Sequence, residues 1–339
     1  MSVVERVWRG RDGAWQRPFR EQARIGARAC SRRLQRLASD FALEESFGTA
    51  VQRLREHHGV ALSASSLRLF TLEHAGHMAR QQLQRAPVRT LPARGADTIV
   101  AEADGSMLPQ VEFLPGEGDR RKRRHLLWQE ARLLAAQAHG SAQSVYAVSL
   151  GGVTEAGEQW AHAARQAGWA TGSRLHVLGD GAEWIEIQHG IHFGRHGRYL
   201  VDFFHVCEYL AAAAPAELPD WLQRQKQRLR DNQAQALIEE LVLRLEPAEV
   251  PDDQAPVRSA HRYLSNRRHA LDYRSALAAD LPIGSGLIES AHRHIFQRRL
   301  KIPGAAWLRS SAEAIAHARA LRANGHWLSY WSDSPLARN

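Results

Sequence analysis

The chain has 339 residues, 44% of them hydrophobic, which is enough for two or three domains with sizeable cores. Its 45 lysines and arginines outnumber 36 aspartates and glutamates, and the net charge of +9 favours a polyanionic partner, most often nucleic acid. No apolar run approaches the ~18 residues of a membrane span, and the basic amino terminus lacks the apolar segment of a signal peptide. The two cysteines, Cys30 and Cys207, are too few for a disulfide framework or a cysteine-based zinc site. We therefore expect a cytoplasmic protein without a membrane partner.

The first predicted region, residues 1–94, is rich in Ala, Leu, Arg, Gln and Glu and is expected to be helical. Within it, residues 49–59 form an amphipathic segment that ends at a glycine, and Ser63 or Ser65 can cap a second helix running to about residue 76. A helix, a glycine turn and a capped helix resemble a helix-turn-helix, whose second helix enters the DNA major groove. An ordinary helical hairpin is the alternative interpretation.

As a recognition helix, this second helix would present exposed side chains to base edges, Arg68 and Thr71 among them. The apolar Leu67 and Phe70 would face the preceding helix instead. Prolines within residues 85–92 then mark the clearest domain boundary of the chain.

Short apolar segments separated by glycines and turns begin near residue 98 and indicate β-strands. The predicted strands cover residues 98–104, 126–136, 144–150, 174–180 and 198–204, and a helix is predicted over residues 154–168. Three strands that can pair as hairpins, followed by a helix and two further strands, indicate a mixed sheet with a right-handed crossover. Helical patterns return from residue 207 to 280, and two more helices are expected between residues 285 and 322.

Two of the predicted strands end in an Asp-Gly pair, at Asp104 and at Asp180. One such pair is usually a turn signal. Ends of adjacent parallel strands lie ~4.8 Å apart, so two carboxylates there can reach the same divalent ion. Carboxylate oxygens are the ligands that Mg²⁺ prefers beside substrate phosphates. The sequence therefore predicts a magnesium site at these two strand ends.

A third acid, Glu289, lies in the first turn of a predicted helix that Ser285 can cap. Favourable interaction with the helix dipole alone would explain a first-turn glutamate. The flanking glycines at 284 and 286 favour close backbone approach, and the basic residues that follow favour a phosphate-binding surface. Glu289 is therefore a candidate third metal ligand.

Asp202 and His205 form an Asp-x2-His unit at the end of the fifth predicted strand. A lone histidine at such a place is most often structural. Near the other acids, His205 can orient a phosphate, donate to the scissile oxygen or assist proton transfer, and Asp202 can serve as a metal ligand or support one. Metal binding by His205 is a further alternative.

In this order, the motifs resemble a DDE transposase of the RNase H-like superfamily. More closely, the chain is similar to the ISKra4-type bacterial insertion-sequence transposases, relatives of the Mutator-like group, from about residue 101 to residue 331. The strings that carry the resemblance are ADGSM (103–107), WQEA (128–131), GDGAEWI (179–185), VDFFHVCEYL (201–210), PIGSGLIES (282–290) and RRLKIPGAAW (298–307).

The resemblance implies an α/β fold in which an RNase H-like, mixed five-stranded sheet has flanking helices and an all-helical insertion before the last catalytic helix. The expected divisions are a helical DNA-binding region over 1–94, the first part of the catalytic core over 95–208, the insertion over 209–280, and the last part of the core with a C-terminal tail over 281–339.

The resemblance also implies an acidic triad of Asp104, Asp180 and Glu289 holding two Mg²⁺ ions, with Mn²⁺ as a substitute. Asp104 would bridge both ions, and His205 would contact substrate. The expected partner is double-stranded DNA, both element ends and target, bound by a nucleoid-associated homo-oligomer without a small-molecule cofactor. Beyond the helix-turn-helix, the expected phosphate contacts are Arg293, Arg298, Arg299 and Lys301.

Other functions remain open. An RNase H-like nuclease would cleave DNA without strand transfer, and a decayed or domesticated DNA-binding protein would keep the basic surface alone. A two-carboxylate glycoside hydrolase accounts for the acids but leaves the basic clusters unexplained.

Overall fold

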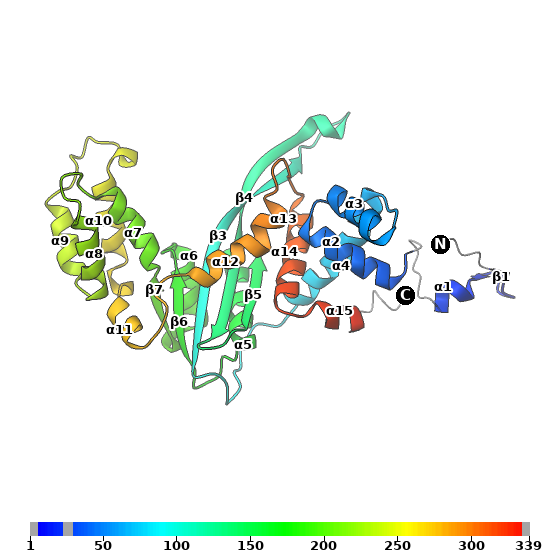
Figure 1. Ribbon diagram of the computed structural model, residues 1–339, viewed down its shortest axis with the longest axis horizontal. Coiled ribbons are helices and arrows are strands. Elements are labelled where there is room, and N and C mark those ends of the chain that lie inside the picture. The colour runs from blue at the N-terminus through cyan, green and yellow to red at the C-terminus, as the bar shows by residue number, and fades with distance from the viewer. Residues whose placement is uncertain (1–5, 23–29, 334–339) are drawn as a thin grey trace. The chain divides into compact units, whose positions relative to one another are not determined.

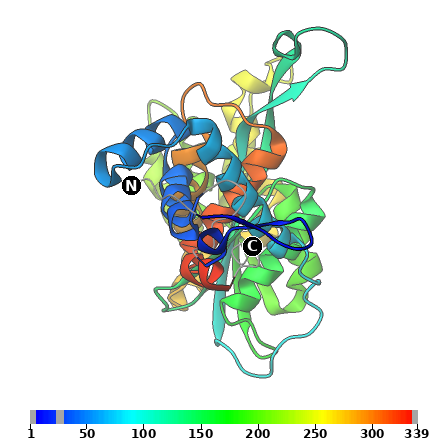
Figure 2. The ribbon, with the colours of Figure 1, turned by 90° about the vertical axis from the view of Figure 1, so that its right-hand side faces the viewer.

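The computed structural model describes residues 6–22 and 30–333 (Figures 1 and 2). The chain forms two compact units, each made of segments distant in sequence. The first contains residues 1–85, 108–129 and 294–339, and the second contains residues 86–107 and 130–293. Residues 294–333 therefore belong with the N-terminal helices, whereas the sequence had grouped 281–339 with the sheet. The last part of the expected tail, residues 334–339, lies outside the described residues.

A five-stranded sheet in the order β5-β4-β3-β6-β7 forms the centre of the second unit. Its strands are β3 (Thr98–Phe113), β4 (Arg124–Ala138), β5 (Ser144–Ser149), β6 (Arg174–Gly179) and β7 (Gly197–Val201). β4 and β5 pair antiparallel, while β6 runs parallel to both β3 and β7. The predicted mixed α/β sheet of five strands is thus confirmed.

Alternating side chains of β3 and β6 enter two separate cores, as strand geometry requires. On one face, α5 (Val153–Gln166) and α6 (Glu183–His192) cover the sheet through buried Trp160 and Ile185. On the other face, Val100 and Leu178 join the core of the helical insertion. By the same alternation, Asp104 in β3 lies on the strand face that carries Val100, and Asp180 follows β6 in step with Leu178.

The insertion is all-helical, as expected. It comprises α7 (Phe203–Ala212), α8 (Trp221–Arg230), α9 (Ala234–Val242), α10 (Pro256–Asn266) and α11 (Tyr273–Ala278). Fully buried Trp221 and Tyr273 lie in its core. The chain then enters α12 (Gly286–His292), a π-helical turn (Arg293–Gln297) and α13 (Arg298–Leu300).

The first unit packs a small helical core. Its elements are β1 (Trp8–Arg9), β2 (Trp15–Gln16), α1 (Pro18–Gln22), α2 (Arg32–Glu44), α3 (Phe47–His58), α4 (Ala64–Leu83), α14 (Arg309–Ala323) and α15 (Trp327–Asp333). α3 ends at Gly59 in the left-handed conformation, and Ser63 caps α4 by accepting a hydrogen bond from Ser66 N, as predicted. α4 continues past the predicted end near residue 76 because α14 packs along it.

Within residues 6–22 and 30–333, no helix has the length and apolar character needed to cross a membrane.

Candidate active site

Asp104 and Asp180 lie on neighbouring parallel strands. The pairing of β3 with β6 joins Glu102 to Leu178, and the same register continued by two residues brings Asp104 opposite Asp180. The sequence predicted that the strand ends at Asp104, but β3 continues to Phe113. Only the parallel pairing of β3 with β6 ends near Asp104, and this exposes the two carboxylates at the end of β6.

The charge of Asp104 acts on the ionisation of Asp180. Burial raises the pKa of the Asp180 carboxyl, the hydrogen bond from Ala182 N (2.8 Å) lowers it, and the negative charge of Asp104 raises it again. The side chain of Asp104 is 32% exposed, and its Oδ1 accepts a hydrogen bond of 2.7 Å from Gly105 N. A divalent cation would relieve the repulsion between these two carboxylates.

The helix α12 approaches this pair through His292, whose Nε2 lies 2.9 Å from Asp104 Oδ2. Glu289 precedes His292 by three residues, so both lie on one side of the helix. The Glu289 side chain is exposed, as a ligand for an incoming group should be. The structure therefore brings the element that carries the third predicted acid to the strand that carries the first.

Asp202 connects β7 to the start of α12. Its Oδ1 caps α7 by accepting hydrogen bonds from Phe204 N (2.6 Å) and His205 N (3.0 Å). Its Oδ2 accepts from Ser285 N (2.6 Å) and from the Ser285 hydroxyl. Ser285 stands at the predicted N-cap position of α12, but its hydroxyl does not cap that helix because Asp202 takes it. With four donors and 2% exposure, Asp202 positions the site and has no oxygen left for a metal.

Glu102 is a second buried carboxyl, and the sequence analysis missed it. It is 2% exposed and accepts a hydrogen bond of 2.8 Å from Ile288 N in the first turn of α12. Burial raises its pKa to about 7, and the backbone hydrogen bonds from α12 oppose that rise. Its place two residues before Asp104, on the same strand face, was the available signal.

His176 completes the attachment of this segment, because its Nε2 lies 2.7 Å from Pro282 O. The backbone adds a further bond, from Phe203 N to Ile283 O (2.9 Å). Three sheet residues (Glu102, His176 and Asp202) thus fix the path of residues 282–288 and hence the position of Glu289.

The insertion holds the turn that carries Asp180. Tyr263 donates its hydroxyl proton to Asp180 O (2.5 Å), and the Arg267 guanidinium donates two hydrogen bonds to Gly181 O (2.8 and 2.6 Å). Gly181 has φ +87°, a conformation that a side chain would strain. The sequence analysis identified the Asp-Gly turn but not the two side chains that hold it, which come more than eighty residues later in the chain.

His205 lies at the same edge. It is half-buried, its Nδ1 is 3.4 Å from Glu208 Oε2, and its ring meets the ring of Tyr263 edge-on. The charge of a protonated His205 lowers the pKa of the Asp180 carboxyl, after the larger effects of burial, the Ala182 hydrogen bond and Asp104.

Glu130, in the string WQEA, lies against Gly105 on the strand face opposite to the Asp104 side chain, and a side chain at position 105 would displace its carboxylate. Arg132 pairs with Glu130 and donates a hydrogen bond to Gly151 O (2.9 Å).

The donor set fits a hard divalent cation by its chemistry, because Asp104 and Asp180 offer oxygen ligands and mutual repulsion. Across the described residues, no three His, Cys, Asp or Glu side chains converge tightly enough to form a metal cluster. Glu289 therefore lies on the helix that approaches Asp104 but does not complete a three-residue ligand set.

The expected DNA contacts divide into exposed and buried groups. Arg68, Arg293 and Arg298 are exposed and Lys301 is half-buried, so these four can reach a phosphate. Thr71 is 1% exposed because α2 covers it, and its hydroxyl lies 3.4 Å from Ser39 Oγ. It cannot read a base edge, and that prediction is wrong.

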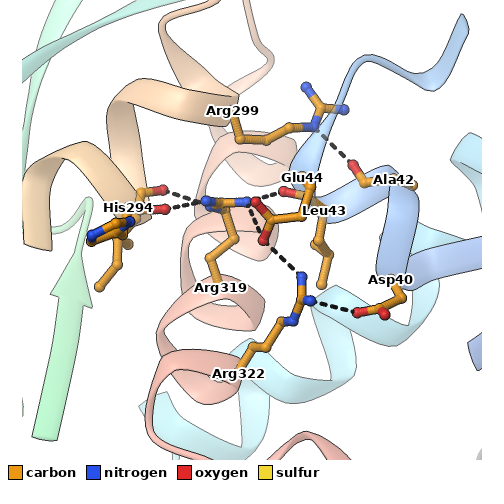
Figure 3. A network of polar contacts seen from close by, with 9 residues as sticks. Asp40, Ala42, Leu43, Glu44, His294, Arg299, Arg319 and Arg322 are labelled. Atoms are coloured by element: carbon orange, nitrogen blue, oxygen red, sulfur yellow. Dashed lines mark hydrogen bonds and ion pairs between the residues drawn. The ribbon is translucent and has the colours of Figure 1, made fainter. Parts of the chain in front are cut away.

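Arg299 is also buried, at 2% exposure, so the expectation that it contacts phosphate is wrong (Figure 3). Its Nε donates to Ala42 O (2.8 Å), and its guanidinium packs on the rings of Phe47 and Trp307. Burial lowers its pKa to about 10. The basic run in the sequence did not reveal that α2, the start of α3 and Trp307 would enclose one of its members.

The fold and this site define a mixed α/β protein with a carboxylate-lined sheet edge. Residues 21–331 match the family described as Uncharacterised protein family (UPF0236), and the chain belongs to that family. No curated protein matches the chain.

Proposed function

We propose that this protein is a DDE transposase, which cleaves DNA at the ends of a mobile element and joins them to a target. The observation that carries the proposal is the meeting of Asp104, Asp180 and the Glu289-bearing helix at one sheet edge. The basic composition, with net charge +9, supports a polyanionic substrate.

An RNase H-like core is part of this proposal. A hairpin of two strands, a third antiparallel strand and two parallel strands, with acids on adjacent parallel strands, support it. The finer assignment to the ISKra4-type transposases rests on the order of the sequence motifs.

Asp104, Asp180 and Glu289 would hold Mg²⁺, or Mn²⁺ in its place, and a two-ion site of this kind would supply Lewis-acid chemistry for phosphodiester cleavage. His292 holds Asp104 Oδ2 in one orientation. The clamp from Tyr263 and Arg267 fixes the backbone of Asp180 and Gly181 before substrate arrives. His205, whose positive charge would lower the pKa of Asp180, would donate a hydrogen bond to a phosphate oxygen.

The experiment that tests this function incubates the protein with duplexes from both flanks of its own genomic locus and Mg²⁺. We expect nicks that free 3′-hydroxyl ends, followed by joined products. Nicks without joining would assign the site to an RNase H-like nuclease. Duplex binding without nicks would assign the chain to DNA-binding proteins.

A further inference from the structure

The outer part of the β3–β4 hairpin, residues 112–128, plays no part in the carboxylate site. In Figures 1 and 2 it is the ribbon that ends in a short helical turn between β3 and β4. That turn, Arg120–Arg123, is capped by Asp119, which accepts a hydrogen bond of 2.9 Å from Arg121 N. Leu114 and Arg123 close the ribbon below it, through Leu114 N to Arg123 O (2.9 Å) and Arg123 Nη1 to Leu114 O (2.9 Å).

The stem of the hairpin is anchored within the first unit. Val111 N donates to Trp307 O (2.8 Å), and Trp307 N donates to Pro109 O (3.1 Å). Gln110 and Val111 are buried there, whereas almost every residue from 112 to 126 is exposed or nearly so. A fixed stem therefore carries a tip that few other residues cover.

Five consecutive residues of this tip, 120 to 124, are basic, and four of them are exposed. Of the three nearby acids, Asp119 is occupied in capping the turn. The Arg120 guanidinium lies 4.0 Å from the Phe113 ring centre, which fixes one basic group over the ribbon. The tip thus concentrates positive charge on a defined scaffold.

Apolar side chains accompany the charge. Leu126 is 52% and Trp128 57% exposed, and both share a strand face with Arg124 because side chains alternate along β4. A face that joins basic and large apolar side chains suits DNA, whose backbone offers phosphates beside apolar deoxyribose and base edges.

We propose that residues 112–128 form an arm that binds duplex DNA, with the basic tip on phosphates and the Leu126–Trp128 edge against the groove. A two-stranded ribbon has the width of the major groove, ~12 Å. The choice of DNA as the polyanion rests on the proposed function. The arm shares no residue with the carboxylate site or with the predicted recognition helix.

The test compares the full-length wild type with the triple variant Arg120→Gln, Arg121→Gln, Lys122→Gln. A matched control, Arg80→Gln, Arg224→Gln, Arg274→Gln, removes the same charge from exposed positions on three helices. Affinity for a random-sequence duplex is measured between about 50 and about 200 mM salt. We expect the slope of log K against log salt to become shallower by about 2.7 in the hairpin variant and by less than one in the control.

If the slope of log K against log salt is the same in the hairpin and control variants, the proposal that residues 112–128 bind DNA is wrong. A hairpin variant that binds duplex normally but self-associates less would assign the face to a second copy of the chain and overturn it too. If the wild type nicks locus DNA while the hairpin variant keeps the wild-type salt dependence of duplex affinity, the DNA-binding arm is ruled out and the proposed function stands. If the wild type binds no duplex, both fail. If Trp128→Ala binds duplex DNA with wild-type affinity, the Leu126–Trp128 edge does not contact DNA.

Discussion

At the scale of single residues, the carboxylates of the site differ in how many hydrogen bonds they accept. Asp202 accepts four, whereas Asp104 accepts one from the backbone and meets one histidine. A carboxylate with spare lone pairs and partial exposure can take up a cation, and one without them holds the scaffold. This difference separates the metal-ligand candidates from the positioning residue.

A buried histidine in the first unit gives a prediction about stability. Burial lowers the pKa of His317 from 6.5 to about 4, and its Nδ1 lies 3.1 Å from Gln82 Oε1. Between these pH values the unfolded chain binds a proton that the folded chain refuses, so stability falls as pH falls. Above pH 6.5, His317 should not reduce the free energy of unfolding. Near pH 4, it should reduce it by up to about 3 kcal/mol.

Chemical unfolding of the wild type and of His317→Asn, measured from pH 7.5 to pH 4.5, checks this prediction. The variant is expected to lose less stability across that range than the wild type. Identical pH profiles would show that His317 does not titrate as its burial requires.

Sequence reasoning found Asp104, Asp180, Glu289 and Asp202 because each stands beside a turn signal or a helix start. Glu102 was missed although it shares a strand face with Asp104, because its hydrogen-bond partner Ile288 is 186 residues away. Long-range hydrogen bonds of this kind depend on the topology, which a local pattern does not contain.

At the scale of elements, α12 is held by its N-terminal segment. Asp202→Asn would turn an amide NH₂ either toward the two α7 N–H donors of Phe204 and His205 or toward Ser285, where it opposes the backbone N–H and makes the hydroxyl rotate to accept. Loss of charge-assisted hydrogen bonds and of a helix cap should lower the free energy of unfolding by at least ~2 kcal/mol. Cleavage by the folded fraction should fall because Glu289 is displaced.

Ser285→Ala is the milder companion variant, since it removes the hydroxyl alone and keeps Ser285 N on Asp202. Thermal unfolding and a cleavage assay at a temperature where both variants are folded provide the two readouts. Wild-type cleavage by a destabilised Asp202→Asn would restrict Asp202 to a purely structural role.

Arg299 gives the opposite kind of prediction. Arg299→Ala removes the hydrogen bond to Ala42 O and two ring contacts from a buried site, so we expect about 2–4 kcal/mol of destabilisation. Arg298→Ala, on the exposed side of the same turn, should leave stability within ~0.5 kcal/mol and weaken duplex binding. Denaturant titration and duplex affinity of both variants test this contrast; a stable Arg299→Ala that binds DNA weakly would reverse it.

The strand positions were predictable because alternation and flanking turns are local signals, and all five lie where expected. The length of β3 was not predictable, because Pro109 and the Gly-Ser pair that follows Asp104 are typical of a strand end. The outcome at Thr71 has a similar cause: an amphipathic pattern defines faces, but only packing with α2 decides which face is covered.

At the scale of the whole molecule, net charge overstates the basic surface. Arg319 donates to the carbonyls of Leu43 and His294 and pairs with Glu44, and Arg322 bridges Glu44 and Asp40 (Figure 3). These arginines hold helices of the first unit together. The charge available for DNA therefore lies on the exposed positions, and the hairpin arm carries a dense part of it.

The central claim is that Asp104 ligates the cation that cleaves DNA, and one measurement tests it most directly. Nicking of locus DNA in Mg²⁺ and duplex affinity are measured together for the wild type, Asp104→Asn and the control Asp97→Asn, which alters an exposed aspartate just before the same strand. The account predicts that Asp104→Asn loses at least ~10³-fold in nicking rate with duplex affinity unchanged, while Asp97→Asn behaves as the wild type. Nicking at the wild-type rate by Asp104→Asn would contradict the account.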